Sequence, residues 1–143
     1  MKLAKPILLL GILVLAFVCA TSQTRPTQSQ AMAKWAGKYP DAKFFNQPQI
    51  RGPLRRILSK ADYDSVGYYN LMVPIKRVGD YLVTYASIKY SDPLESLSLA
   101  FGIKDNAVYV VFQKGEEHRK FSTKNNEFNL PDDVLEELGL KEQ

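Results

Sequence analysis

Cysteine and histidine are almost missing from this sequence, and their scarcity excludes several kinds of chemistry. The chain has one cysteine, Cys19, and one histidine, His118. A zinc site needs several such ligands together, and a Ser-His-Asp or Cys-His arrangement would need His118 as its base. The sequence also has neither G-x-x-x-x-G-K-S/T nor G-x-G-x-x-G. We therefore predict a non-enzymatic protein without metal or cofactor; a small hydrolase that uses His118 is the catalytic alternative.

Long runs of one charge sign are absent as well. The full chain has 19 basic and 15 acidic residues, for a net charge of +4. Loss of an N-terminal segment containing Lys2 and Lys5 would leave 17 basic and 15 acidic residues, a net charge of +2. Away from that segment the basic residues form no run longer than a doublet, such as Arg55-Arg56 and Arg119-Lys120. This balance predicts no nucleic-acid partner.

The first twenty residues have the pattern of an export signal. Two lysines precede an apolar run from Ile7 to Val18, which is short for a bilayer span, and small residues follow it. We predict a signal peptide over residues 1–20, cleaved after Ala20, and a periplasmic or secreted protein. Two alternatives are a retained anchor helix and a lipoprotein modified at Cys19, although Val18 stands where lipoprotein signals carry Gly, Ala or Ser. The cleaved chain would have no cysteine and hence no disulfide.

Residues 21–33 are polar and predict a flexible leader, so that the folded domain would cover residues 34–143. A short helix is expected near 30–37, and a second follows Pro48, whose missing N–H is harmless in a first helical turn. The apolar spacing from Ile50 to Leu58 supports that second helix, although Gly52-Pro53 should delay or kink it. Ser59 to Asp62 breaks the pattern, and a third short helix is predicted over 63–70. The arginines of the second helix are interpreted as a solvated surface.

The second half of the chain predicts an antiparallel sheet. Strands are expected over 71–78, 81–88, 95–103, 107–113 and 118–123, with Pro74 confining the first to an edge. Leu97, Leu99 and Phe101 alternate with small residues, which indicates one buried face and room for a covering element or a partner on the other. A last helix should begin near Pro131 and end at Gly139. The fold class is therefore α+β, with about five strands and flanking short helices.

The connection between the second and third predicted strands is long and polar, and it is the best candidate for a recognition element. It contains Lys89, a cation, and Tyr90, a rigid amphipathic contact residue. Ser87, Ser91 and Asp92 are expected to shape this loop. The plainer interpretation is an ordinary hairpin connection, and composition alone does not separate the two.

Several segments, in order, resemble the periplasmic inhibitors of vertebrate c-type lysozyme, the Ivy family. They extend from Trp35 to about Leu138, and they are Gly37-Lys38-Tyr39-Pro40, Phe44-Phe45 with Pro48, Asp62-Tyr63, Leu71 to Ile75, Gly79 to Val83, Leu99 to Phe101, Val108 to Val110, and Leu130-Pro131. The resemblance implies a central antiparallel sheet with flanking helices, a protein partner such as a lysozyme or another cell-wall hydrolase, and a homodimer among the known arrangements. Family members inhibit by inserting a protruding Cys-Lys-Pro-His-Asp-Cys loop between the two catalytic carboxylates of lysozyme.

The corresponding region here, Ala86 to Leu94, departs from that loop because it has neither cysteine nor histidine. Loss of the disulfide would remove preorganisation, and a partner of charge +2 gains no electrostatic steering towards a basic lysozyme. The expected function is therefore protein binding through the loop near Lys89-Tyr90. The alternative is an envelope binding or immunity protein that retains the fold without inhibiting lysozyme.

Overall fold

The computed structural model describes residues 27–141, so the predicted signal peptide and Cys19 lie outside the described residues. Four short α-helices come first: α2 (Gln28–Ala33), α3 (Ala42–Phe45), α4 (Pro48–Ile57) and α5 (Lys60–Ser65), followed by the 3₁₀ turn η1 (Val66–Tyr68). Six strands follow: β1 (Leu71–Met72), β2 (Lys76–Val78), β3 (Tyr81–Ser87), β4 (Glu95–Gly102), β5 (Val108–Lys114) and β6 (Glu117–Ser122). Helix α6 (Asp132–Glu137) closes the described chain. Among the described residues, no helix is long and apolar enough to span a membrane.

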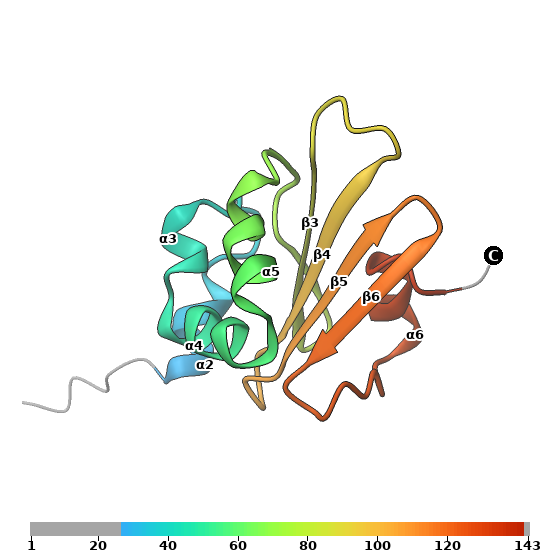
Figure 1. The fold of residues 1–143 in the computed structure, drawn as a ribbon. Coiled ribbons are helices and arrows are strands. Elements are labelled where there is room, and N and C mark those ends of the chain that lie inside the picture. The colour runs from blue at the N-terminus through green and yellow to red at the C-terminus, as the bar shows by residue number, and fades with distance from the viewer. Residues whose placement is uncertain (1–26, 142–143) are drawn as a thin grey trace, which may run out of the picture.

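The strands form one antiparallel sheet in the order β1-β3-β4-β5-β6, with β2 also paired to β3. Helices α2 to α5 cover one face and α6 covers the other (Figure 1). The predicted α+β class with an antiparallel sheet is thus confirmed. Pro74 explains why the first predicted strand is split into β1 and β2, because it cannot donate to the ladder and both pieces lie at the outer edge of β3.

The alternation of β4 determines which core each side chain enters. Leu97, Leu99 and Phe101 lie with the buried residues of the helical layer, and Phe101 is fully buried. Ala100 belongs to a second cluster on the opposite face, where Val134 of α6 packs. The small residues of β4 therefore leave room for α6, which is the covering element that the alternation predicted.

Helix boundaries differ from the sequence predictions in several places: α2 ends at Ala33 rather than near residue 37, α3 is not among the predicted helices, and the helix predicted over 63–70 is α5 followed by η1. Ser59, predicted to interrupt the helices, is the N-cap of α5, and its Oγ accepts a hydrogen bond from the Asp62 N–H at 3.1 Å. Helix α4 begins at Pro48 and continues through Pro53, so the predicted delay is wrong. Pro53 is tolerated because its ring is buried, while the missing N–H removes only one bond within the helix.

The folded domain includes part of the predicted leader. Helix α2 lies within it, and Met32 is completely buried in the core of the helical layer. At the other end, Gly139 terminates α6 with φ at +72°, and its N–H donates to the Glu136 carbonyl as predicted for a C-terminal glycine. The predicted strand over 118–123 and last helix are present with ends shifted by a residue.

Candidate functional site

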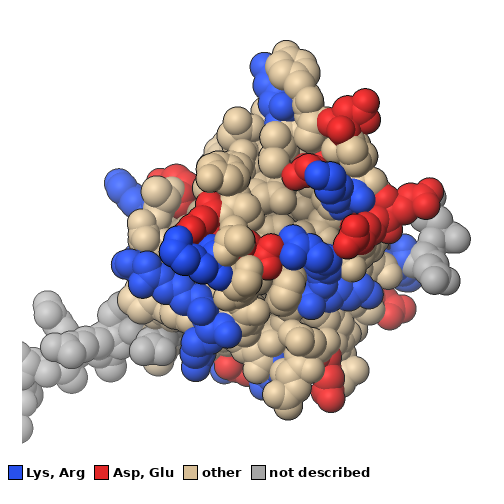
Figure 2. All heavy atoms as spheres, in the orientation of Figure 1, with Lys and Arg blue, Asp and Glu red and all other residues tan. Residues whose placement is uncertain are grey.

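The connection between β3 and β4, residues 88–94, protrudes beyond the sheet, and we call it the tip loop (Figures 1 and 2). Tyr90 is at its apex with 90% of its surface exposed, the largest value among the exposed large hydrophobic residues of the described chain. Its φ of +62° places it in the left-handed region, which is uncommon for a bulky residue. Lys89 extends over the same ring, with Nζ 4.8 Å from the ring centroid.

A hydrogen-bonded base fixes the tip loop. The Ile88 N–H donates to the Glu95 carbonyl at 3.0 Å, which extends the ladder of β3 and β4 by one bond. Ser91 then closes the loop, because its Oγ donates to the Ile88 carbonyl at 3.1 Å and accepts from the Glu95 N–H at 2.8 Å. The loop is therefore anchored by backbone and side-chain bonds rather than by a disulfide.

The turn between β5 and β6 supports the tip loop from one side. The Gly115 N–H donates to the Leu94 carbonyl at 3.1 Å, and a Cβ at Gly115 would lie 3.4 Å from the Pro93 side chain. Lys114 pairs with Glu95 at 2.6 Å at the base of the loop. The peptide bond between Asp92 and Pro93 is cis. Neighbouring strands thus position the apex from below.

The structure separates the five predicted site residues into three groups. Lys89 and Tyr90 form the exposed apex, and Asp92 is exposed beside them. Ser91 is half-buried and shapes the loop through its hydroxyl. Ser87 is only 8% exposed, as the last residue of β3 opposite Ser96, so its side chain supports the sheet below the loop.

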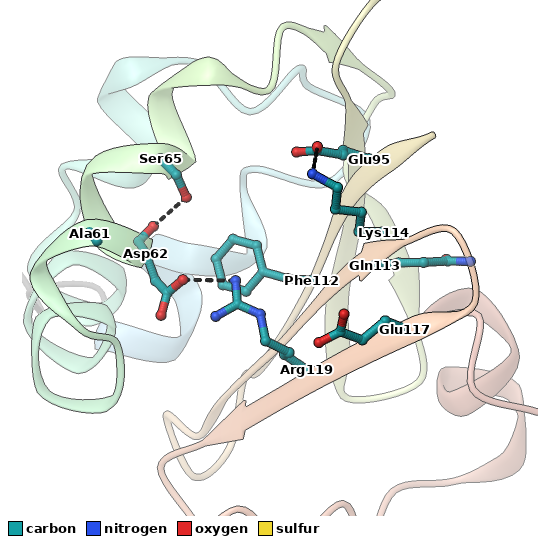
Figure 3. Close-up of a pocket in the computed structure, with 9 residues that line it drawn as sticks. All are labelled: Ala61, Asp62, Ser65, Glu95, Phe112, Gln113, Lys114, Glu117 and Arg119. Carbon is teal, nitrogen blue, oxygen red and sulfur yellow. Dashed lines mark hydrogen bonds and ion pairs between the residues drawn. The ribbon is translucent and has the colours of Figure 1, made fainter. Parts of the chain in front are cut away.

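A charged cleft opens below the tip loop, between α5 and the ends of β4, β5 and β6 (Figure 3). Its volume is about 260 Å³, and it is lined by Ala61, Asp62, Ser65, Glu95, Phe112, Gln113, Lys114, Glu117 and Arg119. Helix α5 contributes one wall because Asp62 lies in the turn that Ser59 caps. The strand ends contribute the other wall.

Arg119 and Asp62 hold the two walls together. The Arg119 Nη2 lies 2.8 Å from Asp62 Oδ1, and the guanidinium stacks 5.3 Å from the Phe112 ring centroid (Figure 3). The hydrogen bond from Arg119 lowers the pKa of Asp62 and outweighs the opposing effect of burial. Asp62 therefore stays ionised, which suits an ion pair rather than a proton donor in catalysis.

Tyr69 is buried behind the same cleft. Its ring packs 6.0 Å from that of Phe112, and burial, followed by the nearby Glu95 carboxylate, raises the pKa of its hydroxyl. The group therefore stays neutral at ordinary pH. The cleft is thus a structural junction of ion pairs over aromatic rings, at the base of the tip loop.

His118 lies on β6 opposite Gln113, where it is exposed. Within the described residues its side chain makes no hydrogen bond or ion pair that would orient it as a base. No group of three or more His, Cys, Asp or Glu side chains among residues 27–141 could hold a metal ion.

Sequence reasoning identified the tip loop but not the cleft. Asp62 and Arg119 are distant in sequence, and no local pattern pairs them. The one sequence feature at this site is the basic doublet Arg119-Lys120. Composition alone does not indicate that this doublet contacts α5.

No family model, curated protein or solved structure matches this chain.

Proposed function

We propose that this is a non-enzymatic, protein-binding protein of the periplasm or of the secreted fraction, and that it engages its partner through Lys89 and Tyr90 at the apex of the tip loop. The observation that carries the proposal is the 90% exposure of Tyr90 on an anchored loop in a left-handed conformation. A tyrosine contributes a large contact area at a small cost in conformational entropy, which makes it a frequent anchor of protein interfaces.

The contacts at the loop base support this role. Ser91 and Gly115 restrict the loop before any partner arrives, so less conformational entropy is lost on binding. The stacked ammonium of Lys89 adds a cation beside the ring. A narrow apex with an aromatic ring and a cation fits a concave site that contains carboxylates, such as the cleft of a lysozyme or another cell-wall hydrolase.

Lysis of bacterial cells by c-type lysozyme, with the purified protein added as residues 21–143, tests the sharpest form of this proposal. We expect slower lysis, and the Tyr90→Asn variant should lose the effect because asparagine accepts the left-handed conformation but lacks the ring. Tyr68→Asn is the matched control, because Tyr68 is also exposed, at 68%, but lies outside the loop. Unchanged lysis at micromolar excess would exclude inhibition of c-type lysozyme.

A second function is favoured by one observation, namely that the tip loop has neither the cysteines nor the histidine of the inhibitory motif. In this case the protein retains the same binding loop for a different envelope partner, as an immunity or envelope binding protein. A pull-down from envelope extract with wild type, Tyr90→Asn and Tyr68→Asn as baits separates the two functions. A partner other than lysozyme that depends on Tyr90 alone supports the second; capture that is equal for all three baits contradicts a role for the loop.

A further inference from the structure

Two neighbouring hollows beside α4 have an unusual lining, because no acidic residue contributes to either. The first, of about 420 Å³, is lined by Arg56, Ile57, Ser122, Thr123, Asn125 and Asn126. The second, of about 260 Å³, is lined by Pro48, Gln49, Pro53, Arg56 and Asn106. Arg56 is common to both, and we call the pair the Arg56 groove. We propose that the Arg56 groove binds a phosphate group, either free or carried by a larger molecule.

Arg56 is available to a ligand. Its side chain is exposed near the end of α4 and forms no ion pair with any described carboxylate. Arg119, in contrast, is engaged by Asp62, and Arg55 stacks 5.2 Å from the Tyr63 ring. A guanidinium without a carboxylate partner, beside a polar hollow, favours a bidentate oxyanion.

Hydrogen-bond donors without an acceptor line the first hollow together with Arg56. Thr123 Oγ1 accepts from the Val108 N–H, so its own hydrogen is still available. Asn126 uses Oδ1 to accept from the Ser122 N–H, which leaves its NH₂ group as a donor. Asn125 and Asn126 both have positive φ, at 55° and 60°, and within the described chain their backbone N–H groups donate to no acceptor. Successive N–H groups in a turn of this kind form anion-binding concavities.

The charge around the groove is consistent with this ligand. Arg51 and Arg55 lie on the same helix, and Figure 2 shows Lys and Arg side chains gathered over the helical layer. Of the acidic residues nearest in sequence, Asp105 pairs with Lys124 at 3.4 Å, whereas Glu127 accepts only from the neutral Asn129 amide and lies outside the lining of both hollows. The lining of the two hollows therefore combines one cation with polar side chains and contains no carboxylate.

Titration of ¹⁵N-labelled protein (residues 21–143, which retain both cores) with inorganic phosphate against chloride at constant ionic strength tests the proposal. We expect saturable shifts at the backbone amides of Thr123, Asn125 and Asn126. Arg56→Ala should weaken the apparent affinity by about tenfold or more, as expected for a lost charge-assisted bond. Arg51→Ala, which removes the same charge from the same helix without lining the groove, should change it by less than about twofold.

Asn125→Asp provides a second, independent variant. Aspartate accepts a left-handed backbone, so the turn is retained, but the added carboxylate should abolish phosphate binding by repulsion. Glycerophosphoglycerol, a deacylated lipid headgroup, serves as the second probe: binding of this phosphodiester indicates a lipid or polymer source, whereas binding of inorganic phosphate alone indicates the free ion. The absence of amide shifts with both probes, or equal affinity in Arg56→Ala and Arg51→Ala, would overturn the proposal.

Discussion

At the scale of single residues, the ion pair between Asp62 and Arg119 is the most informative contact. It joins a helix to an edge strand, and its arginine packs over two aromatic rings, those of Phe112 and Phe121. The Asp62 side chain is 16% exposed but that of Arg119 is 48% exposed, so solvent screening limits the stabilisation to roughly 1 kcal/mol. The ion pair is therefore more important for the placement of α5 against β6 than for the stability of the domain.

We expect Asp62→Asn to reduce the free energy of unfolding by roughly 1 kcal/mol at neutral pH. Because the folded-state pKa of Asp62 is lowered, its contribution is complete above the unfolded value of about 3.9 and is lost as the pH falls through the folded pKa. The difference between wild type and variant should thus shrink with acidification below about pH 4. Urea denaturation at a series of pH values measures this difference in unfolding free energy. Asp64→Asn is the control: Asp64 belongs to an exposed pair with Lys60, so this substitution should have no resolvable effect at any pH. A gap between wild type and Asp62→Asn that does not vary with pH would contradict the assignment.

At the scale of elements, the tip loop shows how a hairpin connection is made rigid without a disulfide. Two bonds of the Ser91 hydroxyl and one bond from Gly115 replace a covalent link. Gly115 adopts φ of +59°, a conformation that residues with a side chain rarely adopt, so the supporting turn favours glycine. The loop and the β5–β6 turn therefore act as one unit.

Ser91→Ala should loosen the tip loop while leaving the domain folded. The Glu95 N–H would lose its acceptor, and its amide hydrogen should exchange several-fold faster, since a neutral hydrogen bond contributes roughly 1 kcal/mol. Hydrogen exchange followed by NMR measures this. Ser65→Ala, which removes a hydroxyl that bonds to the Asp62 carbonyl, should leave Glu95 unchanged. Equal protection of Glu95 in all three proteins would show that Ser91 does not anchor the loop.

At the scale of the whole molecule, the sheet separates two apolar clusters of unequal size. The larger, under α2 to α5, includes Phe44, Ile50, Leu54 and Phe101, all at or near zero exposure. The smaller cluster is held by α6, whose Val134 is 1% exposed. Because β3, β4 and β5 contribute side chains to both clusters, the two should unfold together.

Phe101→Ala should cost about 3–5 kcal/mol of unfolding free energy, because it leaves a large cavity in a fully buried site. Val134→Ala, in the smaller cluster, should cost about 2 kcal/mol for the lost methyl groups. Leu94→Ala, at a site 55% exposed, should change little. Urea unfolding followed by circular dichroism and by Trp35 fluorescence should give coincident transitions for each variant. Separate transitions for the two probes would contradict a single cooperative domain.

Local patterns predicted the sheet well, because alternation with a period of two directly encodes which side of a strand is buried. Leu97, Leu99 and Phe101 were placed on one face, and the structure confirms it. The helical half was predicted less accurately. Ser59 was interpreted as a break because a capping residue and a helix interruption look alike until the hydrogen bond to the Asp62 N–H is seen. The Gly52-Pro53 pair predicts a delayed helix, but α4 continues through Pro53, whose ring is buried.

By itself, the sequence determined the α+β class, the faces of the central strands, the ends of α6 and the position of the tip loop. These depend on periodicity and on residues with strict backbone preferences, which act over a few neighbours. Only the tertiary structure brought Asp62 to Arg119, placed Gly115 beneath Leu94 and put Arg56 beside Asn125 and Asn126. Contacts of this kind join segments far apart in the chain. They depend on how helices and sheet pack against one another, and no local pattern of residues encodes that packing.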